Sequence, residues 1–193
     1  MKKLYLVHCW SGTINDGWYP WLKEKLAEHD IDFIAHNMPN TDTPKINEWV
    51  SYLDEIVENL DDETYFIGHS IGCQTIMRFL ERKDVTKIAG ILFVAPWLNL
   101  LPDEMDEESN EIAHEWINTP INFEKIKQFT NNVTCIFSDD DYFVPLDNQE
   151  KFKEMLDAKT IVVKNKGHIS ADDDIYEADF ILDEITSMMN KNH

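Results

Sequence analysis

Short apolar runs alternate with longer amphipathic segments along most of the chain. The runs are rich in β-branched and aromatic residues, which favour strands. Six strands are predicted, at residues 4–8, 32–36, 64–68, 88–95, 133–138 and 160–163. Because helical segments separate these strands, the pattern predicts an α/β fold with a mostly parallel sheet of about six strands and helices on both faces.

The segments between the strands show helical spacing of apolar residues. Between the second and third strands the spacing is carried by Ile46, Trp49, Val50, Leu53, Ile56 and Val57. Near the C-terminus it is carried by Ile175, Ile181, Leu182 and Ile185. Such stripes predict core-facing positions without chemistry of their own. The length of 193 residues, with no linker and no repeat, favours a single domain over residues 1–193.

The third strand runs directly into Gly68-His69-Ser70-Ile71-Gly72, and a helical segment follows. A serine in a sharp strand-to-helix turn needs small residues two positions before and after it, and the two glycines meet that need. The pattern predicts a nucleophile elbow that exposes the Ser70 hydroxyl. The Ile71 amide, at a helix N-terminus, is expected to stabilise an oxyanion. The alternative is a tight turn with an inert serine.

A serine nucleophile needs a base and an orienting acid, and both candidates follow later strands. His168 comes after the sixth predicted strand, which places it at the same sheet edge as Ser70. Three consecutive aspartates, residues 139–141, follow the fifth strand. We predict Asp141 as the acid because it begins an Asp-x-x-Val-Pro segment similar to that of α/β-hydrolases. Asp140 is the alternative. The order serine, aspartate, histidine is also the α/β-hydrolase order.

Loops at the same edge supply candidates for the rest of the site. The loop at residues 8–12 follows the first strand, and we expect its Trp10 amide to be the second oxyanion donor, with the Ser11 amide as the alternative. Trp97, just past the fourth strand, and Trp116 are candidate walls of an acyl pocket. Core packing is the alternative for both, since aromatic side chains dominate cores and pockets alike.

Four segments carry a family resemblance over nearly the whole chain: GWYPWL at 17–22, NMP at 37–39, GHSIG at 68–72 and PINFEKI at 120–126. The chain resembles the small α/β-hydrolase-fold serine hydrolases related to retinoblastoma-binding protein 9. The resemblance implies a serine hydrolase that uses the Ser-Asp-His set above. No Leu-x-Cys-x-Glu segment is present, so the pocket-protein binding in the family's name is not carried over.

The formal net charge of −20 argues against nucleic acid or an anionic membrane surface as a partner. Much of this charge lies in residues 102–111, after the fourth strand, where α/β-hydrolases often place a cap. The segment is either a solvated helix start or a border of the pocket. If it borders the pocket, anionic acyl esters are expected to react more slowly than neutral or cationic ones.

The remaining residues favour a protein without cofactor or metal. Cys9, Cys73 and Cys135 show no paired spacing, which argues against disulfides and zinc. The aspartate runs at 139–141 and 172–174 lack the alternating ligands and central glycine of a calcium loop. We find neither a signal peptide nor a transmembrane stretch, so a cytoplasmic location is expected.

Together these features predict a serine hydrolase that cleaves a small ester, thioester or amide through an acyl-enzyme. Pocket shape, which the sequence does not reveal, decides among the three leaving groups. The alternative function is protein–protein binding by a catalytically weak or inactive α/β-hydrolase fold. The oligomeric state is left open.

Overall fold

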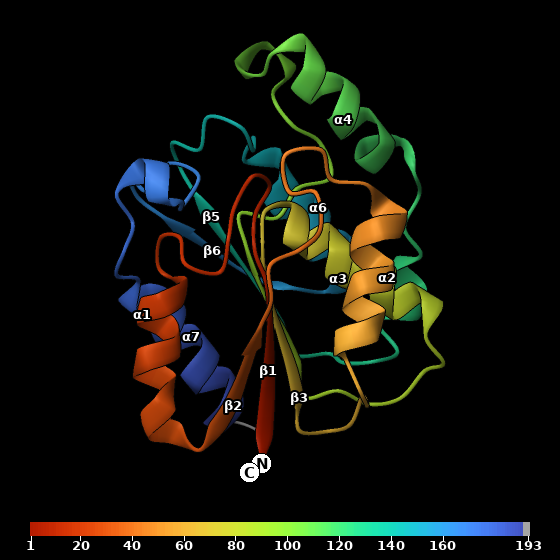
Figure 1. Cartoon of the computed structure of the whole chain (residues 1–193), viewed down its shortest axis with the longest axis vertical. Coiled ribbons are helices and arrows are strands. Elements are labelled where there is room, and N and C mark those ends of the chain that lie inside the picture. Colours follow the sequence, from red (N-terminus) through yellow and green to blue (C-terminus); the bar gives the residue numbers. More distant parts are fainter. Residues whose placement is uncertain (191–193) are drawn as a thin grey trace.

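The computed structural model describes residues 1–190 and contains the predicted sheet (Figure 1). Six strands lie in the order β2-β1-β3-β4-β5-β6, and every neighbouring pair is parallel. The strands are β1 Lys2–Val7, β2 Ile31–Ala35, β3 Thr64–His69, β4 Gly90–Val94, β5 Val133–Ser138 and β6 Lys159–Val163. The predicted fold class is confirmed, and the predicted strand ends differ from these by at most two residues.

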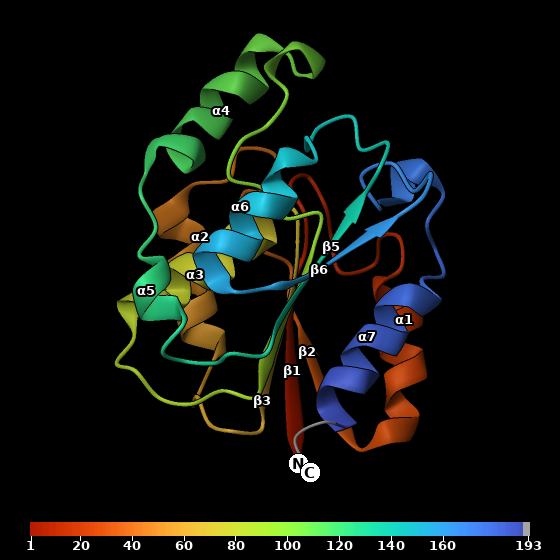
Figure 2. The same cartoon turned by 180° about the vertical axis from the view of Figure 1, so that it is seen from behind.

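Helices cover both faces of the sheet, as predicted. They are α1 Tyr19–Leu26, α2 Ile46–Ile56, α3 Ile71–Arg82, α4 Glu107–Asn118, α5 Phe123–Ile126, α6 Asp147–Leu156 and α7 Asp179–Asn190. Figures 1 and 2 show α1 and α7 side by side on one face, with α2, α3, α5 and α6 on the other. The helix α4 belongs to neither layer and lies beyond the carboxyl ends of the strands.

Each face of the sheet has its own apolar core, and β4 shows how one strand serves both. Ile91 and Phe93 point into the core beneath α2, α3 and α6. Leu92 and Val94 point into the core beneath α1 and α7. Successive side chains of a strand point to opposite faces, so a strand covered on both sides is apolar throughout. This explains why β4 reads as a continuous apolar run.

The two sets of apolar residues predicted to lie on helices, in segments 46–57 and 175–185, differ in how well the prediction holds. In α2, Ile46, Trp49, Val50 and Leu53 are buried. In the C-terminal stripe, Ile181 and Ile185 are buried in α7, but Ile175 precedes that helix. A short 3-10 turn, Ala171–Asp173, ends at Asp174 in the left-handed conformation, with φ of 58°. This turn interrupts the helical path, so Ile175 joins the same core from a loop.

The chain starts at the amino edge of the sheet, and α7 ends beside this start. The Lys2 ammonium donates to the Met189 carbonyl near the end of α7, at 2.9 Å. The loops that follow the strands gather at the opposite, carboxyl edge (Figure 1). Within residues 1–190, no helix combines the length and apolar character needed to cross a membrane.

Candidate active site

Ser70 occupies the sharp turn between β3 and α3, in a backbone conformation that is unusual for a residue with a side chain. Its φ is 55° and its ψ is −120°. Strained values of this kind persist only where the surrounding structure imposes them. Here the Ser70 N–H donates to the Val94 carbonyl at 2.8 Å, and the Ser70 carbonyl accepts from the Cys73 N–H at 3.0 Å. The helix α3 therefore begins at once, at Ile71.

The two glycines of the elbow are needed because backbone segments approach each other closely there. A Cβ atom on Gly72 would lie 2.2 Å from the Val7 carbonyl oxygen at the end of β1. A Cβ atom on Gly68 would lie 2.8 Å from the Cys73 backbone nitrogen. Both distances are shorter than real contacts allow, so the predicted need for small residues has a steric origin.

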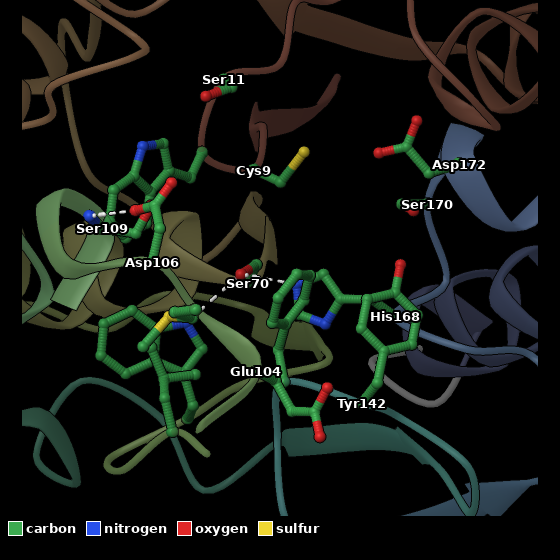
Figure 3. Close-up of a pocket in the computed structure, with 15 residues that line it drawn as sticks. Cys9, Ser11, Ser70, Glu104, Asp106, Ser109, Tyr142, His168, Ser170 and Asp172 are labelled. Carbon is green, nitrogen blue, oxygen red and sulfur yellow. Dashed lines mark hydrogen bonds between the residues drawn. The ribbon is translucent and has the colours of Figure 1, made fainter. Parts of the chain in front are cut away.

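Ser70, His168 and Asp141 form one hydrogen-bonded network. His168 Nε2 lies 2.9 Å from Ser70 Oγ, and His168 Nδ1 lies 2.8 Å from Asp141 Oδ2. Because a carboxylate accepts hydrogen bonds, Nδ1 carries the proton and Nε2 is free to accept the Ser70 hydroxyl proton. The side chains of His168 and Asp141 are only 9% and 2% exposed. Figure 3 shows the Ser70–His168 contact at the base of a cavity.

The Asp141 carboxylate is held by backbone donors. Its Oδ1 accepts from the N–H groups of Phe143 and Val144, both at 2.9 Å. These bonds fix the carboxylate so that Oδ2 faces His168. The Asp-x-x-Val-Pro spacing thus has a structural meaning, because the residues that follow Asp141 wrap around its carboxylate.

Asp140, the alternative acid, has a different set of partners. Its Oδ1 accepts from the Ser138 hydroxyl at 2.7 Å and from the N–H groups of Lys166 and Gly167 at 3.0 and 2.9 Å. The Ser138 and Gly167 hydrogen bonds lower the pKa of Asp140. Asp140 therefore ties the loop that carries His168 to the end of β5 and does not contact the imidazole itself.

The loop after β1 contributes a free backbone N–H. The Cys9 carbonyl accepts from the His8 ring at 2.8 Å and from the Gly12 N–H at 3.3 Å. In a trans peptide the N–H points away from the carbonyl, so the Trp10 N–H is directed away from these partners. The Ser11 N–H is occupied, since it donates to the Thr41 carbonyl at 2.9 Å.

Two N–H groups predicted as oxyanion donors therefore have no partner within the protein. Within residues 1–190, neither the Trp10 N–H nor the Ile71 N–H has a hydrogen-bond acceptor. Ile71 is the first residue of α3, where helical N–H groups lack partners and the helix dipole favours negative charge. Of the two alternatives in the first loop, the geometry leaves Trp10 rather than Ser11 available.

His69 lies next to Ser70 and connects the loops behind the site. Its Nε2 donates to the His168 carbonyl at 2.9 Å, so its Nδ1 accepts from the Tyr19 hydroxyl at 2.6 Å. The Tyr19 hydroxyl in turn accepts from the Cys9 N–H at 3.2 Å. This buried relay joins the Trp10 loop to the backbone of His168. Sequence reasoning missed it, although Tyr19 lies in the GWYPWL segment and His69 in the elbow.

The buried relay should make folding sensitive to acid. Burial, and to a lesser degree the neighbouring His168, lowers the pKa of His69 to about 3. Between about pH 6.5 and pH 3 the unfolded chain then binds a proton that the folded chain does not. The free energy of unfolding is therefore expected to fall by about 1.4 kcal/mol per pH unit from this group as the pH drops below about 6.

Urea unfolding of wild type and His69→Gln over this pH range measures the effect. A glutamine keeps one donor and one acceptor but does not titrate. The variant is expected to be less stable near neutral pH and to lose less stability on acidification. Equal pH slopes for the two proteins would show that His69 is not the titrating group.

A cavity of about 370 Å³ opens above Ser70 at the carboxyl edge of the sheet. Its apolar lining consists of Trp10, Trp97, Leu100, Met105 and Phe143. Trp97 therefore lies where the sequence placed it. The lining also contains the three carboxylates of Glu104, Asp106 and Asp172, and within the described residues it contains no lysine or arginine.

Trp116 is the one predicted wall residue that the structure places elsewhere. It is 1% exposed and lies in the core below α4, where its ring packs against Trp49 with centroids 6.2 Å apart. Its indole N–H donates to the Pro44 carbonyl at 3.0 Å. Trp116 belongs to the C-terminal half of α4, whereas the start of this helix borders the cavity.

The acidic segment 102–111 is both a helix start and a cavity border. Glu104, Met105, Asp106 and Ser109 line the cavity. Asp106 is the N-cap of α4 and accepts from the Ser109 N–H at 2.7 Å. The two alternatives for this segment are thus compatible, because one carboxylate can cap α4 and face the cavity.

Comparison with known proteins agrees with this geometry. The Serine hydrolase family model matches residues 4–182. Serine hydrolase RBBP9 of Rattus norvegicus is 31% identical over 153 residues, which cover 79% of this chain and 77% of the rat protein. The YdeN protein of Bacillus subtilis (strain 168) is 28% identical over 191 residues, which cover 98% of this chain and 97% of YdeN.

Solved structures show the same fold. The crystal structure of the B. subtilis ydeN gene product matches with a TM-score of 0.90 and 27% identity, covering 98% of this chain and 100% of the other. Est1E of Butyrivibrio proteoclasticus, solved with ferulic acid bound, has a TM-score of 0.72 at 15% identity, covering 100% and 89% of the two chains. The resemblance drawn from the sequence is confirmed, and the chain belongs to the serine hydrolase family of the α/β-hydrolase fold, with RBBP9 and YdeN among its relatives.

Proposed function

We propose that this protein hydrolyses small carboxylic esters through an acyl-enzyme formed on Ser70. The observation that carries the proposal is the continuous network from Asp141 through His168 to Ser70 Oγ at the base of the cavity. Each member of this network has the partner that its role requires. The Ser70 hydroxyl contacts a base, His168 carries its proton on Nδ1 and can accept on Nε2, and the Asp141 carboxylate is held by backbone donors.

In the acylation step, Ser70 Oγ attacks the ester carbonyl carbon while its proton moves to His168 Nε2. The carbonyl oxygen becomes negatively charged and is stabilised by the N–H groups of Ile71 and Trp10. The carbon–oxygen bond to the leaving alcohol then breaks, and the alcohol takes the proton from His168. Asp141 stabilises the imidazolium that exists between these two transfers.

In the deacylation step, water attacks the acyl carbon and gives a proton to His168 Nε2. The bond between the acyl carbon and Ser70 Oγ breaks, and His168 returns the proton to Oγ, which releases the carboxylic acid. Proteins of the same fold named for ester cleavage, such as naproxen esterase of B. subtilis, support the choice of an ester. Thioesters and amides would use the same groups, so a substrate panel must separate the three.

Labelling with a fluorophosphonate probe tests the proposal. Phosphonylation requires an activated serine and oxyanion donors, so wild type should be labelled, whereas Ser70→Ala and heat-denatured wild type should not. Folded wild type that takes no label would contradict the proposal and favour the alternative, a binding protein with an inactive site.

The three carboxylates of the cavity lining lead to a prediction about substrate charge. At low ionic strength, Glu104, Asp106 and Asp172 should attract cationic and repel anionic acyl chains. For matched 4-nitrophenyl esters, kcat/KM is expected to be about tenfold higher for a trimethylammonium acyl chain than for a carboxylate one, and high salt should reduce this ratio.

A variant with two of these carboxylates neutralised, Glu104→Gln with Asp172→Asn, is the control. Its ratio should be smaller than that of wild type at low salt. Equal kcat/KM values of wild type for the two esters at low salt would show that the carboxylates do not select substrates.

The proposal also includes the domain organisation, the cellular location and the partners of the enzyme. We propose one domain over residues 1–193 that acts on a small acyl substrate in the cytoplasm, with neither nucleic acid nor an anionic membrane as a partner. The net charge of −20 and the free thiols of Cys9, Cys73 and Cys135 support it.

A further inference from the structure

Trp97 makes a hydrogen bond that the network described above does not explain. Its indole Nε1 donates to Ser70 Oγ at 3.2 Å, and the residue is 1% exposed. The Ser70 hydroxyl gives its own proton to His168, so one lone pair of Oγ faces the indole and the other remains for attack. Trp97 therefore touches the reacting atom itself, in addition to lining the cavity.

A chain of buried polar groups holds Trp97 in this position. Gln74 Nε2 donates to the Trp97 carbonyl at 3.1 Å, and Gln74 Oε1 accepts from Arg78 Nη2 at 2.9 Å. Because arginine only donates, the orientation of the Gln74 amide is fixed. Arg78 Nη2 also donates to the carbonyls of Trp116 and Thr119, both at 2.8 Å. Gln74 and Arg78 are each 1% exposed.

We propose that Trp97 is a catalytic residue that speeds the release of the acyl group from Ser70; this inference rests on the proposed esterase function. When the acyl carbon–Oγ bond breaks, the bonding electrons stay on Oγ until His168 delivers the proton. The Trp97 N–H then faces an oxygen with developing negative charge. In the acyl-enzyme the same oxygen is an ester oxygen, which is a poor acceptor.

The hydrogen bond is consequently stronger in the transition state of deacylation than in the acyl-enzyme, and such a difference accelerates a step. The Trp97 hydrogen bond accelerates acylation less, because in the free enzyme the Ser70 hydroxyl oxygen already accepts this hydrogen bond before the reaction starts. Loss of the indole N–H should therefore slow deacylation more than acylation.

Stopped-flow hydrolysis of 4-nitrophenyl acetate by Trp97→Phe measures both steps. The steady-state rate is expected to fall about tenfold, the effect of one hydrogen bond to a charged oxygen. The rate constant of the initial burst should fall by a smaller factor, and intact-mass spectrometry should show more acyl-enzyme than in wild type. Equal factors for the two phases, or an unchanged steady-state rate, would overturn the proposal.

Trp116→Phe is the matched control. It removes an equally buried indole N–H, whose acceptor is the Pro44 carbonyl, and should leave the ratio of the two rate constants unchanged. If Trp116→Phe shifts this ratio as Trp97→Phe does, the effect is one of packing and the proposal fails.

A second readout does not depend on turnover. In protein labelled with 15N-tryptophan, the indole N–H resonance missing from Trp97→Phe should shift in Ser70→Ala, which removes the acceptor. A resonance that does not move would overturn the hydrogen bond even in an active enzyme. If the resonance moves but wild type takes no fluorophosphonate label, the esterase function and the catalytic role of Trp97 fail while the hydrogen bond stands.

Discussion

Replacement of Ser70 by alanine is expected to reduce kcat for ester hydrolysis by on the order of a million-fold. The substitution removes the atom that forms the acyl-enzyme, and His168 then has no hydroxyl proton to accept. Steady-state hydrolysis of a chromogenic ester, at enzyme concentrations high enough to detect the residual rate, measures the loss.

Two controls test whether the loss of activity comes from the missing nucleophile and not from misfolding or from a general change in the cavity. Ser109→Ala removes another hydroxyl from the cavity lining and should keep most of the activity. Chemical denaturation should show that Ser70→Ala is folded, since alanine and serine bear the same backbone strain at φ of 55°. A folded Ser70→Ala protein with activity near that of wild type would rule out Ser70 as the nucleophile.

Asp141→Asn is expected to lower kcat by about 10⁴-fold, as the equivalent change does in other triads. The N–H groups of Phe143 and Val144 require an oxygen at the Oδ1 position, so the asparagine would turn its amide NH₂ toward His168 Nδ1. The imidazole would then carry its proton on Nε2, where it could not accept the Ser70 proton. Steady-state kcat for a neutral ester, measured over a range of pH, is the assay.

Asp140→Asn is the matched comparison, one residue earlier in the chain. An asparagine oxygen can still accept from Ser138, Lys166 and Gly167, so the loop that carries His168 should keep its position. Its kcat is expected to stay close to that of wild type. If the two variants lost activity equally, the distinct role assigned to Asp141 would be wrong.

Local signals in the sequence were enough for the elbow and the sheet. Gly68 and Gly72 are required because nearby backbone atoms leave no room for a Cβ atom. The continuous apolar sequence of β4 indicates that this strand is buried on both faces. The sequence favoured Asp141 over Asp140 through the Asp-x-x-Val-Pro segment. It did not reveal their separate contacts, because both aspartates follow β5 and face the same loop, where Asp140 accepts from the Lys166 N–H and Asp141 contacts the His168 ring.

Side-chain orientation was the part that the sequence did not reveal. Trp97 reaches Ser70 Oγ across 27 residues of chain, and Tyr19 reaches His69 across 50. Such contacts depend on how separate loops pack and leave no periodic pattern. Trp116 shows the same limit, because an aromatic residue on an amphipathic helix signals burial but not which end of the helix meets the cavity.

The Lys2–Met189 contact has a practical consequence. It brings the start of β1 and the end of α7 together at the amino edge, whereas the cavity opens at the carboxyl edge. A linker attached near either of these positions would leave the molecule on the side remote from the cavity. The protein is therefore well suited to immobilisation on a surface or fusion to a carrier, with its opening turned toward the solution.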